Sequence, residues 1–209
     1  MFKDRTNAGS RLADAIVDDG ITGDIVLAVP RGGLPVGRVV ADRLGVPLDI
    51  VVARKISAPH NPELAIGAVA SDGTLWLNDP LIDDLGVDEE YLDEQIERER
   101  QAAGAKLKRY RDDRAPLELD GKRVLIVDDG VATGATTTAC IRQVAEAGAE
   151  RVILAVPVAP RGAIERLRSE VDEIVCVEVP SHFGAVGQFY ESFEQVSDER
   201  AKTYLRTEE

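Results

Sequence analysis

Five short runs of almost uninterrupted apolar residues divide the chain. Runs of this length, without polar alternation, are typical of strands buried on both faces of a parallel sheet. They predict buried strands over residues 24–29, 46–53, 124–127, 151–156 and 172–179. Between and around them, apolar residues recur with helical spacing, which predicts helices over residues 4–17, 34–44, 160–168 and 198–206 and another that ends at Gly148. Alternating strands and helices predict an α/β fold with right-handed parallel crossovers.

The middle of the chain departs from this alternation. Residues 57–64 are polar and punctuated by proline, which predicts a loop, and residues 67–70 and 74–77 predict a short hairpin. Residues 88–114 then predict a long charged helix, acidic early and basic late, which complements the helix dipole. We interpret it as a solvated helix packed by one apolar stripe. A lid, or a dimer arm that brings basic side chains to a site, is the alternative.

The run at residues 124–127 leads into two carboxylates, Asp128 and Asp129, and then into small and hydroxylated residues before a helix. Free N–H groups and the positive dipole end of a helix N-terminus favour an anion such as phosphate. Carboxylates can accept hydrogen bonds from sugar hydroxyls, each worth about 1.5–3 kcal/mol. The stretch therefore predicts a site for a ribose that carries a phosphate. It is not a Walker loop, because Ala135 stands where the lysine would be.

A second glycine-containing loop follows the first predicted strand. Gly32 and Gly33 let the backbone approach a ligand closely, and Arg31 can donate a forked pair of hydrogen bonds to pyrophosphate oxygens. Arg54 and Lys55 follow the second predicted strand, so we expect them at the carboxyl edge of the sheet, where open α/β sheets bind ligands.

The stretch 124–137 closely resembles the phosphoribosyl diphosphate (PRPP) motif of type I phosphoribosyltransferases, which is an apolar strand, an acidic pair and a Thr-Gly-x-Thr loop. The loop at residues 30–33 resembles their pyrophosphate loop. The resemblance implies their fold, a central and mostly parallel sheet flanked by helices. It would form one domain over residues 1–209, with a helical insertion at about 79–115 and a C-terminal hood or cap at about 180–209.

The resemblance also implies roles for residues of this sequence. The ribose hydroxyls would be held by Asp128 and Asp129, which with Lys55 would be the catalytic residues. The 5′-phosphate would be bound by Gly130, Val131, Ala132, Thr133, Gly134, Ala135, Thr136 and Thr137. The pyrophosphate would be bound by Arg31, Gly32, Gly33, Arg54 and Lys55. Mg²⁺ would be held mainly through PRPP, with help from the acidic pair, since the sequence shows no separate metal cluster.

The same resemblance makes residues 57–64 a mobile loop that closes over PRPP, where His60 and Glu63 could act. The base would stack near the C-terminal aromatic residues, and Phe183 and Val186 are the candidate contacts. Their Phe-x-x-Val-Gly pattern is similar to that of the hypoxanthine–guanine enzymes. Those enzymes commonly carry aspartate at the position of Ala132, whereas adenine- and orotate-type relatives do not. The base stays open, with purine-like favoured over pyrimidine.

Composition narrows the remaining possibilities. The 209 residues are 44% hydrophobic and 30% charged, as in one globular domain, and carry a net charge of −13 that argues against a nucleic-acid partner. An acidic surface poor in lysine suits high salt, which favours a halophilic source. We expect Cys140 and Cys176 to be reduced core residues. No leader opens the chain and no apolar run approaches the roughly 20 residues that span a bilayer, so we expect a cytoplasmic protein without membrane contact.

Three functions are compatible with these features. The first is transfer of the 5-phosphoribosyl group of PRPP to a nitrogenous base with release of pyrophosphate, as in nucleotide salvage, by a homo-oligomer such as a homodimer. The second is a regulator that senses PRPP without transfer. Such regulators usually need a nucleic-acid-binding surface, and the acidic chain shows no basic patch for one. A nucleotide-binding α/β enzyme of another kind is disfavoured by the acidic pair.

Overall fold

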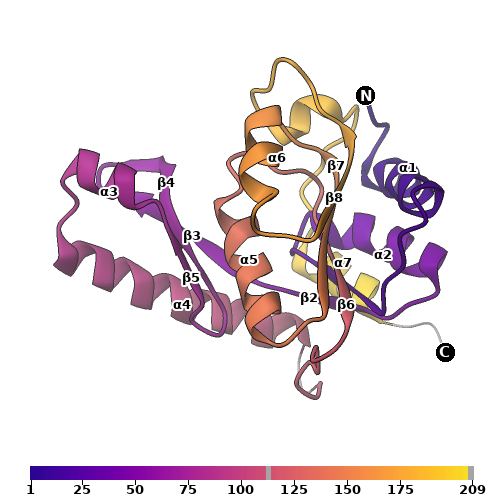
Figure 1. Ribbon diagram of the computed structural model, residues 1–209, viewed down its shortest axis with the longest axis horizontal. Coiled ribbons are helices and arrows are strands. Elements are labelled where there is room, and N and C mark those ends of the chain that lie inside the picture. The colour runs from indigo at the N-terminus through magenta and orange to yellow at the C-terminus, as the bar shows by residue number, and fades with distance from the viewer. Residues whose placement is uncertain (112–113, 207–209) are drawn as a thin grey trace.

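The computed structural model describes residues 1–111 and 114–206, which form a parallel sheet flanked by helices and a second, smaller lobe (Figure 1). The main sheet has five strands in the order β2-β1-β6-β7-β8, and every neighbouring pair is parallel. Its strands are β1 (Ile25–Ala28), β2 (Leu48–Ile50), β6 (Arg123–Val127), β7 (Arg151–Val158) and β8 (Glu173–Glu178). The predicted α/β fold with buried parallel strands is confirmed, because nearly all side chains of β1, β6 and β7 are buried.

Helices cover both faces of this sheet. Because successive residues of a strand point to opposite faces, Val26 packs toward one helical layer and Leu27 toward the other. The first layer contains α1 (Arg5–Asp18), α2 (Gly33–Leu44) and α7 (Asp198–Leu205), and the second contains α5 (Ala135–Glu146) and α6 (Arg161–Leu167). Asp4 caps α1, accepting a hydrogen bond of 2.7 Å from Asn7 N. Within the described ranges, no helix is both long and apolar enough to cross a membrane.

The lobe at the left of Figure 1 is an antiparallel sheet backed by two helices. It contains β3 (Ala53–Ala58), β4 (Asn61–Ala70), β5 (Leu75–Leu77), α3 (Asp79–Leu85) and α4 (Glu89–Arg111). The prediction of one strand over 46–53 is wrong, because the main-sheet strand ends at Ile50 and a new strand begins at Ala53. The loop predicted at 57–64 is also wrong. Those residues form the end of the β3–β4 hairpin, where one face is polar while the other buries Ile56 and Ile66.

Helix α4 joins the lobe to the main body. Its first half packs Tyr91 and Ile96 into the apolar cluster of the lobe, whereas Ala103 and Tyr110 lie in the core cluster of the main sheet. Near its end Arg111 donates two hydrogen bonds to the buried Asp49 of β2, at 3.0 and 3.2 Å. The first half of α4 therefore packs against the lobe and the second half against the main sheet, so the helix connects the two. Residues 112–113 of the predicted helix lie outside the described part of the chain, as do 207–209 of the predicted cap.

The C-terminal segment covers the carboxyl end of the sheet and meets the N-terminus there. Phe2 N donates to Phe189 O at 2.7 Å, and the rings of Phe2 and Tyr190 lie 5.3 Å apart. The short 3-10 helix η1 (Val186–Phe189) lies in this segment, next to the loop that follows β6. The two ends of the chain are thereby brought to the edge of the sheet where the predicted site lies.

Candidate functional site

The two predicted binding loops meet at the carboxyl ends of β1 and β6, which are adjacent parallel strands. The chain leaves β1 for α2 on one face of the sheet and leaves β6 for α5 on the other, so the loops diverge at a topological switch point. The loops touch. A Cβ added at Gly32 would lie 2.1 Å from Asp129 Oδ2, and one at Gly33 would lie 2.7 Å from Val127 O. A side chain at either position would clash, so the two glycines let the predicted pyrophosphate loop lie against the acidic pair.

Asp128 lies directly after β6, and both members of the acidic pair are partly buried. Burial, then the adjacent charge of Asp129, holds the pKa of Asp128 well above its usual range, while Lys106 nearby lowers it. Its Oδ1 accepts a hydrogen bond of 2.8 Å from the backbone N–H of Asp129. The site therefore contains negative charge that its surroundings compensate only in part, which suits a cation or hydrogen-bond donors on a ligand.

Asp129 is held by the two ends of the chain. Arg5 Nε donates to Asp129 Oδ2 at 2.8 Å, with both side chains largely buried, and Tyr190 Oη donates to Asp129 O at 2.6 Å. Burial raises the pKa of Asp129, and the charge of Arg5 lowers it. Arg5 also donates to Glu194 O at 2.7 Å and lies over the Phe193 ring, 3.8 Å from its centroid. Arg5 and Tyr190 are not predictable from the sequence, because no local pattern marks residues that reach a site from opposite chain ends.

The phosphate loop runs from Gly130 into α5. Gly134 adopts φ of 83° just before α5, a left-handed conformation that glycine tolerates. The first N–H groups of α5 have no acceptor within the helix, so they remain available for an anion. Arg166 of α6 donates to Thr133 O at 3.0 Å, which brings one more cation to this loop. These features support the predicted phosphate role of 130–137, which stays a prediction.

The predicted pyrophosphate cations lie in three different surroundings. Arg31 pairs with Asp198 at 3.1 Å, and Arg54 pairs with Glu99 of α4 at 2.9 Å. Lys55 Nζ donates to Pro62 O at 2.7 Å, across its own hairpin. Contrary to expectation, Arg54 and Lys55 do not follow a strand of the main sheet but belong to β3 of the second sheet. The departure of the chain from the main sheet after Ile50 is a tertiary effect that the apolar pattern does not show.

Helix α4 supplies a cation, Lys106, to the loop where Arg54 and Lys55 were expected. Lys106 Nζ donates to the carbonyl of Pro30, within the pyrophosphate loop, at 2.6 Å. Burial, followed by the charge of Arg54, lowers the pKa of Lys106, while Asp128 raises it. Helix α4 thus brings a basic side chain to this loop within one chain, and the alternative interpretation of the 88–114 helix as a lid or a dimer arm stays a prediction.

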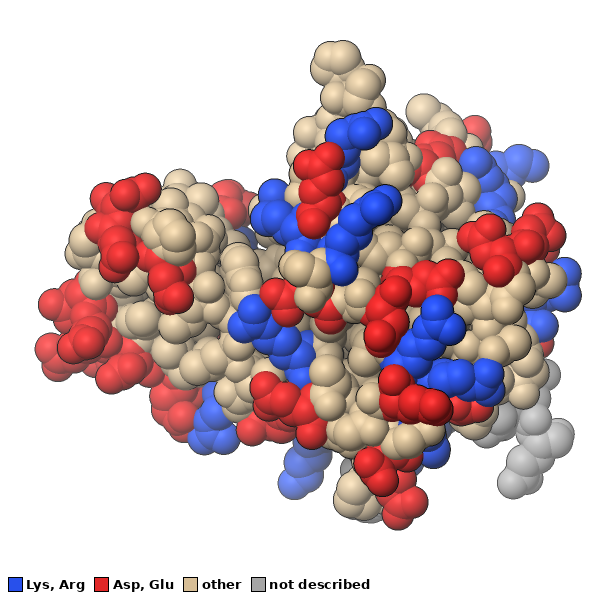
Figure 2. Space-filling model, in the orientation of Figure 1, with Lys and Arg blue, Asp and Glu red and all other residues tan. Residues whose placement is uncertain are grey.

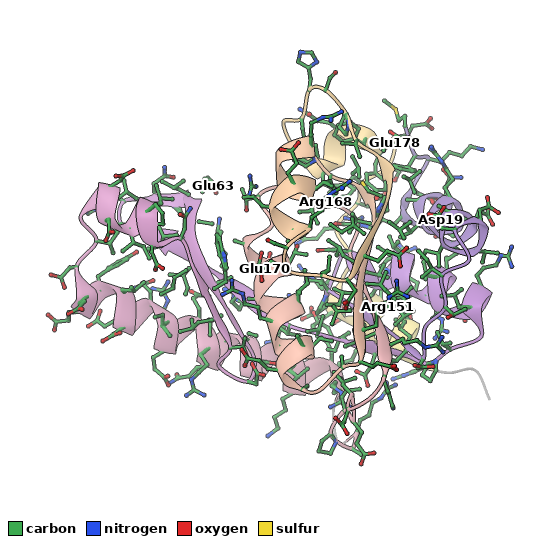
Figure 3. All side chains as sticks on the ribbon, in the orientation of Figure 1. Asp19, Glu63, Arg151, Arg168, Glu170 and Glu178 are labelled. Atoms are coloured by element: carbon green, nitrogen blue, oxygen red, sulfur yellow. The ribbon has the colours of Figure 1, made fainter. Side chains whose placement is uncertain are left out.

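The candidate base contacts lie at the rim of the site. A Cβ at Gly130 would lie 2.6 Å from Val186 Cγ1, so Val186 borders the phosphate loop. Phe183 stacks on Phe189 with ring centroids 5.4 Å apart. His60 lies at the tip of the β3–β4 hairpin with φ of 62°, and Figure 3 shows Glu63 on the side of that hairpin that faces the main body. The roles predicted for these residues stay predictions.

Comparisons with known proteins agree with this geometry. The family model of the phosphoribosyl transferase domain matches residues 3–194. Two Mycobacterium tuberculosis proteins, each named "Putative phosphoribosyl transferase" (MT0597 and Rv0571c), are 38% identical over 205 residues, which is 98% of this chain and 46% of each relative. The chain thus spans about half the length of these curated relatives. The crystal structure of TT1426 from Thermus thermophilus is 42% identical and has a TM-score of 0.83, covering 98% of this chain and 97% of that one. The chain therefore belongs to the phosphoribosyl transferase domain family.

Proposed function

We propose that this chain transfers the 5-phosphoribosyl group of PRPP to a nitrogenous base, purine-like rather than pyrimidine, and releases pyrophosphate. The observation that carries the proposal is the close approach of Gly32 to Asp129. That approach joins a glycine loop suited to a diphosphate to an acidic pair suited to ribose hydroxyls, with a helix N-terminus for the 5′-phosphate beside them. Membership of the family and the names of its M. tuberculosis relatives support the same activity.

The residues of the site would act mainly by holding and orienting the sugar. Asp128 and Asp129 would accept hydrogen bonds from the ribose hydroxyls, and the N-terminus of α5 would hold the 5′-phosphate. Such positioning lowers the entropic part of the barrier. Charge that develops on the departing pyrophosphate would be stabilised by the cations around the Pro30–Gly33 loop, Arg31 among them.

Mg²⁺ fits the donor set, because adjacent carboxylates supply the hard oxygen ligands that it prefers. Burial raises the pKa of Asp128 and of Asp129, and a divalent cation beside them would favour their charged forms. When bound with PRPP, the ion would neutralise diphosphate charge. Within residues 1–111 and 114–206, no group of three or more His, Cys, Asp or Glu side chains is placed to hold a metal ion, so PRPP itself would supply most of the ligands.

A screen of PRPP consumption tests the proposal. The chain is incubated with PRPP and Mg²⁺ against purine, pyrimidine and pyridine bases, in buffers from low to molar salt, and pyrophosphate release is measured. We expect release with at least one purine-like base. Binding of PRPP without release for any base would instead indicate a sensor, and absence of PRPP binding would refute both functions.

Asp129→Asn provides the matched variant for this screen. The change keeps the size of the side chain but removes the charge that faces Arg5, so we expect PRPP binding to weaken at least 10-fold. We expect the fold to persist, because the loss of about 1–3 kcal/mol is smaller than the usual stability of a domain. Circular dichroism checks the fold, and an unfolded variant would mean that Asp129 has a structural role.

A further inference from the structure

Lys106 occupies an unusual position for a lysine. It shares a helical face with Ala103 and Tyr110, three residues before it and four after it, both of which are buried in the core of the main sheet. Its half-buried stem runs along this face, and its Nζ reaches the Pro30 carbonyl at 2.6 Å. Lysine on a core-packed helical face is uncommon because its charge must be desolvated. The helix therefore bears a cost that the interaction with one carbonyl only partly offsets.

Neighbouring positive charges further increase the free energy of the charged Lys106 side chain. Arg54 and Arg31 lie close enough to disfavour its charged form, and Asp128 is the acid that opposes them. Three cations therefore lie near one another, on β3, on the loop after β1 and on α4. Asp198 and Glu99 pair with Arg31 and Arg54 and offset part of their mutual repulsion, and a bound anion near Lys106 would offset more of it. A diphosphate, with several negative charges, is an anion of the size and charge that this group would bind.

The side chain of Lys55 points to its own hairpin and not to the Pro30–Gly33 loop. Its Nζ donates to Pro62 O at 2.7 Å, and Ser57 Oγ donates to the same carbonyl at 3.0 Å, so Lys55 stiffens its own hairpin. Lys106, in contrast, already touches the loop whose glycines make room for a ligand. The difference between the two lysines indicates which of them faces the diphosphate.

We propose that Lys106, delivered by α4, is a diphosphate-contacting residue of this site and determines its affinity for the pyrophosphate end of the sugar substrate. This inference rests on the proposed function, because it assumes a diphosphate at the Pro30–Gly33 loop. When a diphosphate binds, Lys106 would donate a hydrogen bond to one of its oxygens, either in place of the bond to the Pro30 carbonyl or in addition to it. It would thereby recognise pyrophosphate without contact to the ribose or the 5′-phosphate.

Substitution of Lys106, with titration calorimetry of two ligands, tests the inference. The full chain is titrated with pyrophosphate in the presence of Mg²⁺ and, separately, with ribose 5-phosphate. Lys106→Gln can still donate a hydrogen bond to the Pro30 carbonyl but lacks the charge. We expect it to weaken pyrophosphate binding about 10- to 100-fold, as loss of a charge-assisted hydrogen bond does, and to change ribose 5-phosphate binding by less than about twofold.

Two further variants control for packing and for charge. Lys108→Gln removes an exposed lysine two positions along the same helix, and we expect wild-type affinity for both ligands. Lys106→Arg keeps the charge, and we expect it to retain most of the pyrophosphate affinity, which also keeps the test valid if the glutamine variant does not fold.

Each of the other outcomes would count against the inference. Wild-type pyrophosphate affinity in Lys106→Gln would mean that the side chain only positions the Pro30 carbonyl. Equal weakening of both ligands would mean a general structural effect. A wild-type chain that binds neither ligand nor PRPP would overturn the proposed function together with this inference, whereas the first two outcomes would overturn this inference alone.

Discussion

Gly32→Ala perturbs the contact on which the site depends. The φ angle of Gly32 is −61°, which alanine adopts readily, so the backbone itself does not require glycine. The new Cβ, however, would lie 2.1 Å from Asp129 Oδ2 and 2.6 Å from Asp129 Cγ, far inside van der Waals contact. The carboxylate of Asp129 must therefore move. Because Arg5 Nε holds that same oxygen at 2.8 Å, the movement breaks the ion pair.

The magnitude follows from these contacts. Loss of a charge-assisted hydrogen bond between largely buried partners costs about 1.5–3 kcal/mol, and insertion of a methyl group into a filled space costs a further amount of about 1 kcal/mol or more. We expect the free energy of unfolding to fall by roughly 2.5–4 kcal/mol. In a domain of about 200 residues each kcal/mol lowers the melting temperature by about 2–4 °C, so the decrease should be about 5–16 °C.

Thermal unfolding followed by circular dichroism measures this decrease, and calorimetry measures PRPP binding, which should fall at least 10-fold with the displaced Asp129. Gly104→Ala is the matched control, since its Cβ on α4 would meet nothing within 4 Å. It should stabilise the chain by about 0.5–1 kcal/mol, because alanine favours a helix interior over glycine. A Gly32→Ala variant with wild-type stability and PRPP affinity would refute the argument that this approach requires glycine.

Two further substitutions test other parts of the site. Asp128→Asn should stabilise the metal-free chain by about 1–3 kcal/mol at neutral pH, because it removes a buried charge with an incomplete counterion. The folded-state pKa of Asp128 is raised, so its cost is present above that pKa; the gain measured by thermal unfolding should disappear as the pH falls to about 4. Phe183→Ala should raise KM for the base several-fold and leave KM for PRPP unchanged; an equal rise in both would place Phe183 outside the base site.

The apolar pattern was sufficient to predict the main sheet but not the lobe. Runs such as 124–127 and 152–156 are apolar at every position because both faces are buried, and each lies in a strand where predicted. The run at 46–53 is apolar except for Asp49, yet it contains the break between two sheets. Burial explains the error: Val51 and Val52 are buried in the turn between β2 and β3, so their side chains give no sign that the strand has ended.

The residues of the candidate site also fall into a group that the sequence predicts and a group that it does not. Its loop residues were predictable because strand, glycine or acidic pair, and helix follow each other directly in sequence. Arg5, Tyr190 and Lys106 were not, since each reaches the acidic pair or its neighbouring loop from an element far away in the chain. The signal available for Lys106 was its helical spacing from Ala103 and Tyr110, and it lay within a stretch dense in charge.

The distribution of charge explains how a chain of net charge −13 can suit a polyanionic substrate. Acidic side chains gather at the outer end of the lobe, over α3 and the start of α4 (Figure 2). Screening at physiological salt acts over about 8 Å, so these exposed charges have little effect at the distant switch point. Lys106 contacts the predicted pyrophosphate loop, and the charges of Arg31 and Arg54 act on Lys106, where partial burial reduces screening. The potential that a diphosphate meets is therefore set by these cations and the acidic pair, and the net charge of the chain does not determine it.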